Sequence, residues 1–103
     1  MATSARHTVA LLVVPRLLRD TLARALAVLD VDLVDRRAAL ERAEPVDVAI
    51  VSRSAAVDIP AWVVVRLPAE TDGGVGSVTT RGVRRPVMLD DLAAVLDIVR
   101  TYC

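Results

Sequence analysis

The stretch from Arg85 to Leu92 reads Arg-Pro-Val-Met-Leu-Asp-Asp-Leu and joins an apolar strand to an acidic helix start. Apolar residues continue beyond it at helical spacing, at Leu92, Val95, Leu96 and Val99. We expect a strand over Val83 to Met88 and a final helix that Asp90 caps and that runs to about Tyr102. A strand followed directly by an amphipathic helix is the repeating unit of an α/β fold.

The rest of the chain repeats this alternation of strand and helix. The predicted strands are continuous apolar, β-branched runs, which suit a parallel sheet covered on both faces. They span Thr8 to Val14, Val31 to Val34, Val46 to Val51 and Ala61 to Leu67. Helices are predicted over Arg16 to Leu29 and from an Asp35 cap through Glu44. The pattern predicts an α/β sandwich with a parallel sheet.

Length, charge and cysteine content narrow the class of protein. The 103 residues form one domain, predicted to span residues 1–103 and to stand alone. Thirteen basic residues balance thirteen acidic ones, so no basic field indicates a nucleic-acid partner. The single cysteine, Cys103, excludes an internal disulfide. The apolar run near the N-terminus is far shorter than the roughly 20 residues that span a bilayer. It also does not have the pattern of a signal peptide. We expect a soluble cytoplasmic protein without a membrane partner.

Three local patterns are shared with a known family. The segment Leu17 to Leu22 looks like the start of that family's first helix, Asp47 like the residue that opens its third strand, and Arg85-Pro86 replaces its Lys-Pro. With these features the chain resembles, over nearly its whole length, the receiver domain of bacterial two-component response regulators. The resemblance implies a flavodoxin-like, five-stranded parallel sheet with strand order 2-1-3-4-5.

The resemblance also implies that the phosphorylation chemistry is lost. Val13 and Val14 stand where receivers place the acidic pair that holds Mg²⁺, and Ser52 replaces the phosphoacceptor aspartate. Arg66 falls near the position of the hydroxyl residue, and Arg85 on that of the lysine. We therefore expect no metal, no cofactor and no enzymatic activity. Ser52 is either a kinase substrate or, as we favour, a strand-end hydroxyl bonded to backbone. The resemblance further implies a cis peptide before Pro86.

Two connections are too short for the receiver's third and fourth helices. Ser52 to Arg66 leaves room for one helical turn, and Pro68 to Arg81 contains three glycines. With helices three and four shortened or missing, one apolar sheet face is left open, which monomers rarely tolerate. We expect a homodimer or a protein partner to cover it. The alternative is irregular cover by residues 53–61 and 68–82.

These observations favour a regulatory or scaffolding module in signal transduction, acting through protein–protein contacts. Trp62, the only tryptophan, is a candidate interface anchor, although we slightly favour a core position for it. The alternative is a pseudo-receiver that senses a small anionic or apolar ligand in the crevice at the carboxyl ends of the strands. That crevice would be lined by Val13, Val14, Ser52, Arg66 and Arg85. Arg81, Arg84 and Arg85 form a further basic cluster beside the last strand, which we interpret as a solvated strand end; the alternative is an acceptor of an acidic partner or a phosphate.

Overall fold

The computed structural model describes residues 7–13, 16–53, 57–68 and 73–102. Their elements, in chain order, are β1 (His7–Leu12), α1 (Arg16–Leu26), β2 (Val31–Val34), α2 (Arg36–Leu40), β3 (Val46–Val51), β4 (Ala61–Arg66), β5 (Val75–Thr80), β6 (Val83–Met88) and α3 (Leu92–Tyr102). Three strands, β2, β3 and β6, have the bounds that the sequence predicts. Val14 lies outside the described residues.

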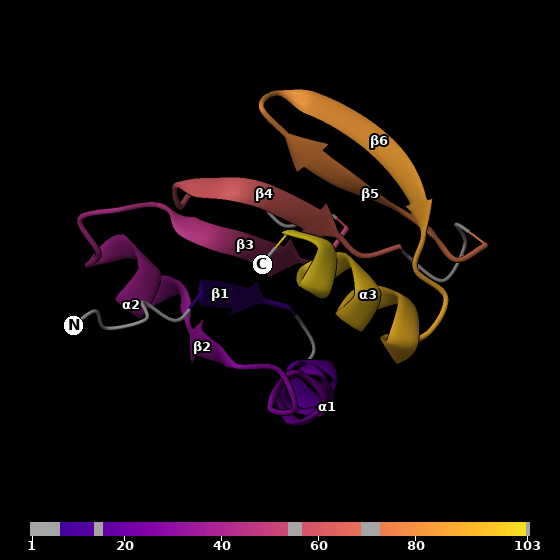
Figure 1. Ribbon diagram of the computed structural model, residues 1–103, viewed down its shortest axis with the longest axis horizontal. Coiled ribbons are helices and arrows are strands. Elements are labelled where there is room, and N and C mark those ends of the chain that lie inside the picture. The colour runs from indigo at the N-terminus through magenta and orange to yellow at the C-terminus, as the bar shows by residue number, and fades with distance from the viewer. Residues whose placement is uncertain (1–6, 14–15, 54–56, 69–72, 103) are drawn as a thin grey trace.

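The strands form one mixed sheet in the order β2-β1-β3-β4-β5-β6 (Figure 1). Strands β2, β1, β3 and β4 are parallel, whereas β5 runs antiparallel to β4, and β6 antiparallel to β5. The α/β class and the order of the first four strands agree with the expectation. The prediction of five parallel strands is wrong, because residues 75–80 form a strand that lies between β4 and the strand expected to be its neighbour.

A two-residue turn explains the extra strand. Arg81 and Gly82 connect β5 to β6, with φ of 51° and 77°. Two successive residues with positive φ are the signature of a type I′ turn, whose twist matches that of paired antiparallel strands. The chain therefore reverses at Arg81-Gly82, and the residues on both sides of this dipeptide pair as Thr79 with Arg84 and Thr80 with Val83.

Helices α1 and α3 cover one face of the sheet. Leu22 and Leu26 of α1, and Val95 and Val99 of α3, pack in a core with apolar side chains of β1, β3, β4 and β5. The cap of α3 differs from the expectation: the Asp91 carboxylate, rather than that of Asp90, accepts a hydrogen bond from the Ala94 N–H at 2.9 Å.

The opposite face is covered over β1 and β3 by the chain itself. Ile59, in the connection between β3 and β4, and Ala39 of α2 pack on buried residues of these strands. Arg36 of α2 and Asp58 hold the two covering segments together with an ion pair of 3.2 Å. The prediction of an open apolar face is therefore wrong over β1 and β3, where irregular cover, the alternative, is what the structure has. Among the described residues of the two shortened connections, none is helical.

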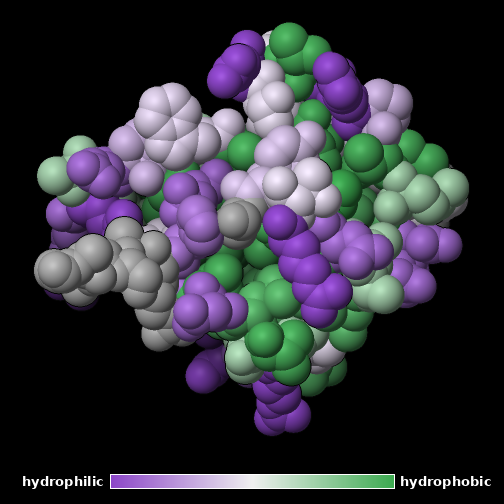
Figure 2. All heavy atoms as spheres, viewed as in Figure 1, coloured by the Kyte–Doolittle hydropathy of each residue, from purple (hydrophilic) through white to green (hydrophobic). Residues whose placement is uncertain are grey.

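The β5–β6 hairpin extends beyond these layers at one edge of the sheet (Figure 1). Most of β6 is exposed, and Figure 2 shows hydrophobic atoms along this part of the molecule with strongly hydrophilic side chains projecting between them. No helix in the described residues has the length and apolar character needed to cross a membrane.

Candidate functional site: an arginine pocket

The carboxyl ends of β1, β3 and β4 meet at one edge of the sheet, where the sequence predicts a crevice. The Ser52 N–H donates to the Leu12 carbonyl oxygen at 3.4 Å, and the Leu67 N–H to that of Val51 at 2.9 Å. Val13 follows β1 and is buried in the core. The structure thus brings Val13, Ser52 and Arg66 to one edge.

Arg85 does not join them. It pairs with Val78 in the middle of β6, and β5 lies between its strand and β4. Since neighbouring strands lie about 4.8 Å apart, Arg85 is displaced by about two strand spacings from β4. Its placement in the crevice is therefore wrong, and the inserted strand is the reason.

Pro86 also lies within β6, an edge strand, where a missing N–H is tolerated. The cis peptide before it stays a prediction.

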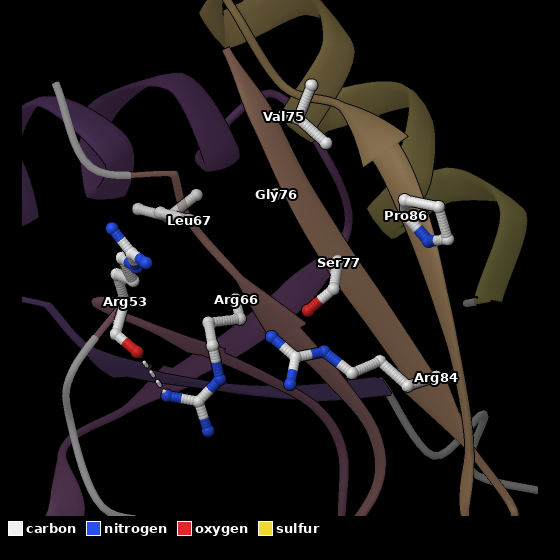
Figure 3. Close-up of a pocket in the computed structure, with 8 residues that line it drawn as sticks. All are labelled: Arg53, Arg66, Leu67, Val75, Gly76, Ser77, Arg84 and Pro86. Carbon is white, nitrogen blue, oxygen red and sulfur yellow. Dashed lines mark hydrogen bonds between the residues drawn. The ribbon is translucent and has the colours of Figure 1, made fainter. Parts of the chain in front are cut away.

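A pocket of about 440 Å³ opens beside this edge, on the sheet face opposite α1 and α3 (Figure 3). The described residues that line it are Arg53, Arg66, Leu67, Val75, Gly76, Ser77, Arg84 and Pro86. They come from the segment after β3, the end of β4 and both strands of the hairpin. None of them is acidic, so their formal charge is positive.

The register of the sheet determines which arginines meet here. Arg66, Ser77 and Pro86 are paired across β4, β5 and β6, so their side chains share one face. Arg84, two residues before Pro86, points to the same face because side chains alternate along a strand. Arg84, rather than Arg85, is therefore the β6 arginine that lies near Arg66.

The Arg66 side chain is fixed by backbone contacts. Its Nη1 donates to the Arg53 carbonyl oxygen at 2.7 Å and to that of Ser52 at 3.3 Å (Figure 3). Both carbonyl groups belong to the segment that follows β3. These two carbonyl contacts fix the orientation of the Arg66 guanidinium at the carboxyl end of β4.

The Arg84 side chain reaches over β5 toward Arg66. Figure 3 shows the two guanidinium groups approaching the same space from β4 and β6, with the Ser77 hydroxyl pointing toward Arg84. Ser77 is only 5% exposed. Arg84 makes no ion pair with any described residue. Like charges that converge repel each other, and an anion between them would remove that repulsion.

Gly76 allows this part of the sheet to pack closely. A Cβ atom on Gly76 would overlap the Arg66 carbonyl oxygen and lie 2.7 Å from Leu89 Cδ1. A residue with a side chain would therefore push β5 away from the end of β4. The glycine, which reads in the sequence as part of a flexible connection, is a packing position beneath the pocket.

The described residues that line the pocket offer hydrogen-bond donors and positive charge. The only histidine, His7, lies in β1 with its Nδ1 3.7 Å from Asp47 Oδ2, and Asp47 also accepts from the Thr8 N–H at 2.7 Å. Within the described residues, no group of three or more histidine, cysteine or acidic side chains could hold a metal ion. The arrangement is suited to holding an anion.

Of the crevice residues expected from the sequence, Arg66 lines the pocket and Ser52 contributes only a backbone carbonyl contact to Arg66. Sequence reasoning missed Arg53, Ser77 and Arg84 as members of one site. The signal that could have found them is the hairpin: β-branched residues on both sides of a two-residue turn that ends in glycine. Comparison of the chain with protein-family models, with curated proteins and with solved structures found no match.

Proposed function

We propose that the protein is a non-catalytic regulatory module that binds a small anionic ligand in the arginine pocket. The observation that carries the proposal is the convergence of Arg66 and Arg84 from two strands on the space beside Ser77. The phosphate or carboxylate group of a ligand would accept paired hydrogen bonds from the guanidinium N–H groups and one from the Ser77 hydroxyl.

The position of the pocket supports this proposal. Ligands of open α/β sheets bind outside the carboxyl ends of the strands, and Arg53 and Arg66 lie at the carboxyl ends of β3 and β4. The order β2-β1-β3-β4 is compatible with a receiver-like ancestry for this half of the sheet. In our proposal, reversible binding of a free anion stands where a receiver would carry a covalent phosphoryl group.

Thermal unfolding with added anions tests the proposal. Inorganic phosphate, sulfate and citrate are compared with chloride at constant ionic strength, and calorimetric titration follows for the best of them. A ligand that binds only the folded state raises the Tm in a saturable way. We expect such a rise for the wild-type chain and for Arg85→Gln, the matched control on the other sheet face, and its loss in Arg84→Gln.

Two outcomes would count against this function. The first is that no anion raises the Tm more than chloride does. The second is that Arg84→Gln and Arg85→Gln lose the rise in Tm equally. The second result would mean that the anions respond to overall charge and not to this pocket.

A further inference from the structure

A second hollow lies at the other end of β4 and has a different composition. It has a volume of about 510 Å³ and is formed by Trp62, Val83 and Tyr102, with Arg81 and Arg85 among its lining residues. Three elements meet there: the start of β4, the turn between β5 and β6, and the end of α3. We call it the aromatic groove.

The aromatic groove exposes large apolar side chains together. Trp62 is 66% exposed, Val83 54% and Tyr102 38%. The core position favoured for Trp62 is therefore wrong, and its role as an interface anchor stays a prediction. Tryptophan, tyrosine and arginine are the residue types that most often dominate binding energy at protein interfaces. Apolar side chains that gather on a surface beside charged groups mark such contact sites.

The charges beside the groove indicate the charge that a partner would carry. Arg81 occupies the turn, and Arg85 projects from β6 on the face opposite Arg84. Neither forms an ion pair with a described residue, and the described residues that line the groove include no acid. Two guanidinium groups beside an apolar surface are complementary to carboxylates that flank an apolar side chain.

We propose that the aromatic groove binds a segment of a partner protein in which one large apolar residue is flanked by aspartate or glutamate. The apolar residue lies between Trp62 and Tyr102, and the carboxylates pair with Arg81 and Arg85. A second copy of the chain fits less well. A two-fold contact brings the same patch of each copy together, so the arginines of the two copies would face and repel each other. The proposal is independent of the arginine pocket, which lies on the other sheet face.

The single tryptophan provides a direct reporter for the test. The probes are twelve-residue peptides with a central leucine, isoleucine or phenylalanine, flanked by aspartate and glutamate in one set and by lysine and arginine in the other. We expect acidic peptides to change the Trp62 fluorescence in a saturable way and basic peptides to leave it unchanged. Anisotropy of labelled acidic peptides should show at least tenfold weaker binding to Arg85→Glu and to Tyr102→Ala, while the matched control Arg84→Glu binds within about twofold of wild type.

Four results would overturn the proposal. The first is that acidic and basic peptides bind equally, and the second is that no peptide binds at millimolar concentration. The third is that Arg84→Glu weakens binding of the acidic peptides as much as Arg85→Glu does. A concentration-dependent dimer that Trp62→Ala dissociates would also overturn it and would assign the groove to a second copy. Failure of the anion experiment would leave these outcomes unaffected.

Discussion

Arg84 and Arg85 are adjacent in β6, yet their side chains line different hollows on opposite faces of the sheet. The separation follows from the pleat of the strand, which sends successive side chains to opposite sides. The basic cluster predicted beside the last strand is therefore divided between two hollows. Arg84 belongs to the arginine pocket, and Arg85 to the aromatic groove.

The turn that joins β5 to β6 is strained at Arg81. Its φ of 51° is in the left-handed region, which is unfavourable for arginine and better tolerated by asparagine. We expect Arg81→Asn to raise the free energy of unfolding by about 0.5–1 kcal/mol, measured by urea denaturation. Gly82→Ala, at φ 77°, is the opposite control and should lower it. A less stable Arg81→Asn variant would contradict the type I′ turn.

Gly76 should tolerate no side chain. Because a Cβ atom would meet the Arg66 carbonyl oxygen and Leu89, Gly76→Ala is expected to lower the free energy of unfolding by about 1–3 kcal/mol. It should also weaken anion binding, since β5 and β4 together form the pocket. Thr79→Ala, in the same strand, is the comparison and should cost less. Equal stability of Gly76→Ala and wild type would show that the strands are less closely packed here.

The cap of α3 can be assigned by a pair of alanine variants. Asp91→Ala removes the carboxylate that accepts from the Ala94 N–H, so the free energy of unfolding should fall by about 0.5–2 kcal/mol. Asp90→Ala removes a neighbouring charge without removing that bond, and it should have a smaller effect. Urea denaturation of both variants distinguishes the two aspartates. A larger loss for Asp90→Ala would restore the cap that the sequence predicts.

Ile59 covers the sheet face that would otherwise be apolar and open. It is buried against β1 and β3, so Ile59→Ala should lower the free energy of unfolding by about 2–5 kcal/mol. The variant should also associate more than wild type in light scattering, because its cover is weakened. The wild-type measurement at the same concentrations tests the self-association expected from the sequence. An Ile59→Ala variant with unchanged stability and mass would mean that this segment does not seal the face.

The sequence was a good guide wherever burial decided the structure. The run Val46–Val51 is apolar on both sides and is buried almost throughout, so its bounds could be predicted to the residue. The acidic cap of α2 was equally clear, since Asp35 accepts from the Ala38 N–H. Apolar residues run without interruption where both faces of a strand meet the core, and β3 comes close to that condition.

The hairpin was missed because its signal differs from that of the buried strands. β5 contains glycine, serine and threonine, and its partner β6 is an exposed edge rich in arginine, so neither has the apolar character of a central strand. The glycines before and within β5 favoured a loop. The candidate site followed the same error: with β5 read as a connection, Arg85 was placed next to Arg66, a position that Arg84 occupies instead.

The two-residue length of the Arg81-Gly82 turn has a consequence for how this chain can change over time. Deleting or inserting one residue there would shift β6 by one position against β5 and would exchange the faces of its two arginines. A substitution of Gly82 changes the stability of the hairpin, and one of Arg81 also changes the charge beside the aromatic groove. A change in the length of the turn would instead exchange Arg84 and Arg85 between the two hollows, so we expect the number of turn residues to be retained.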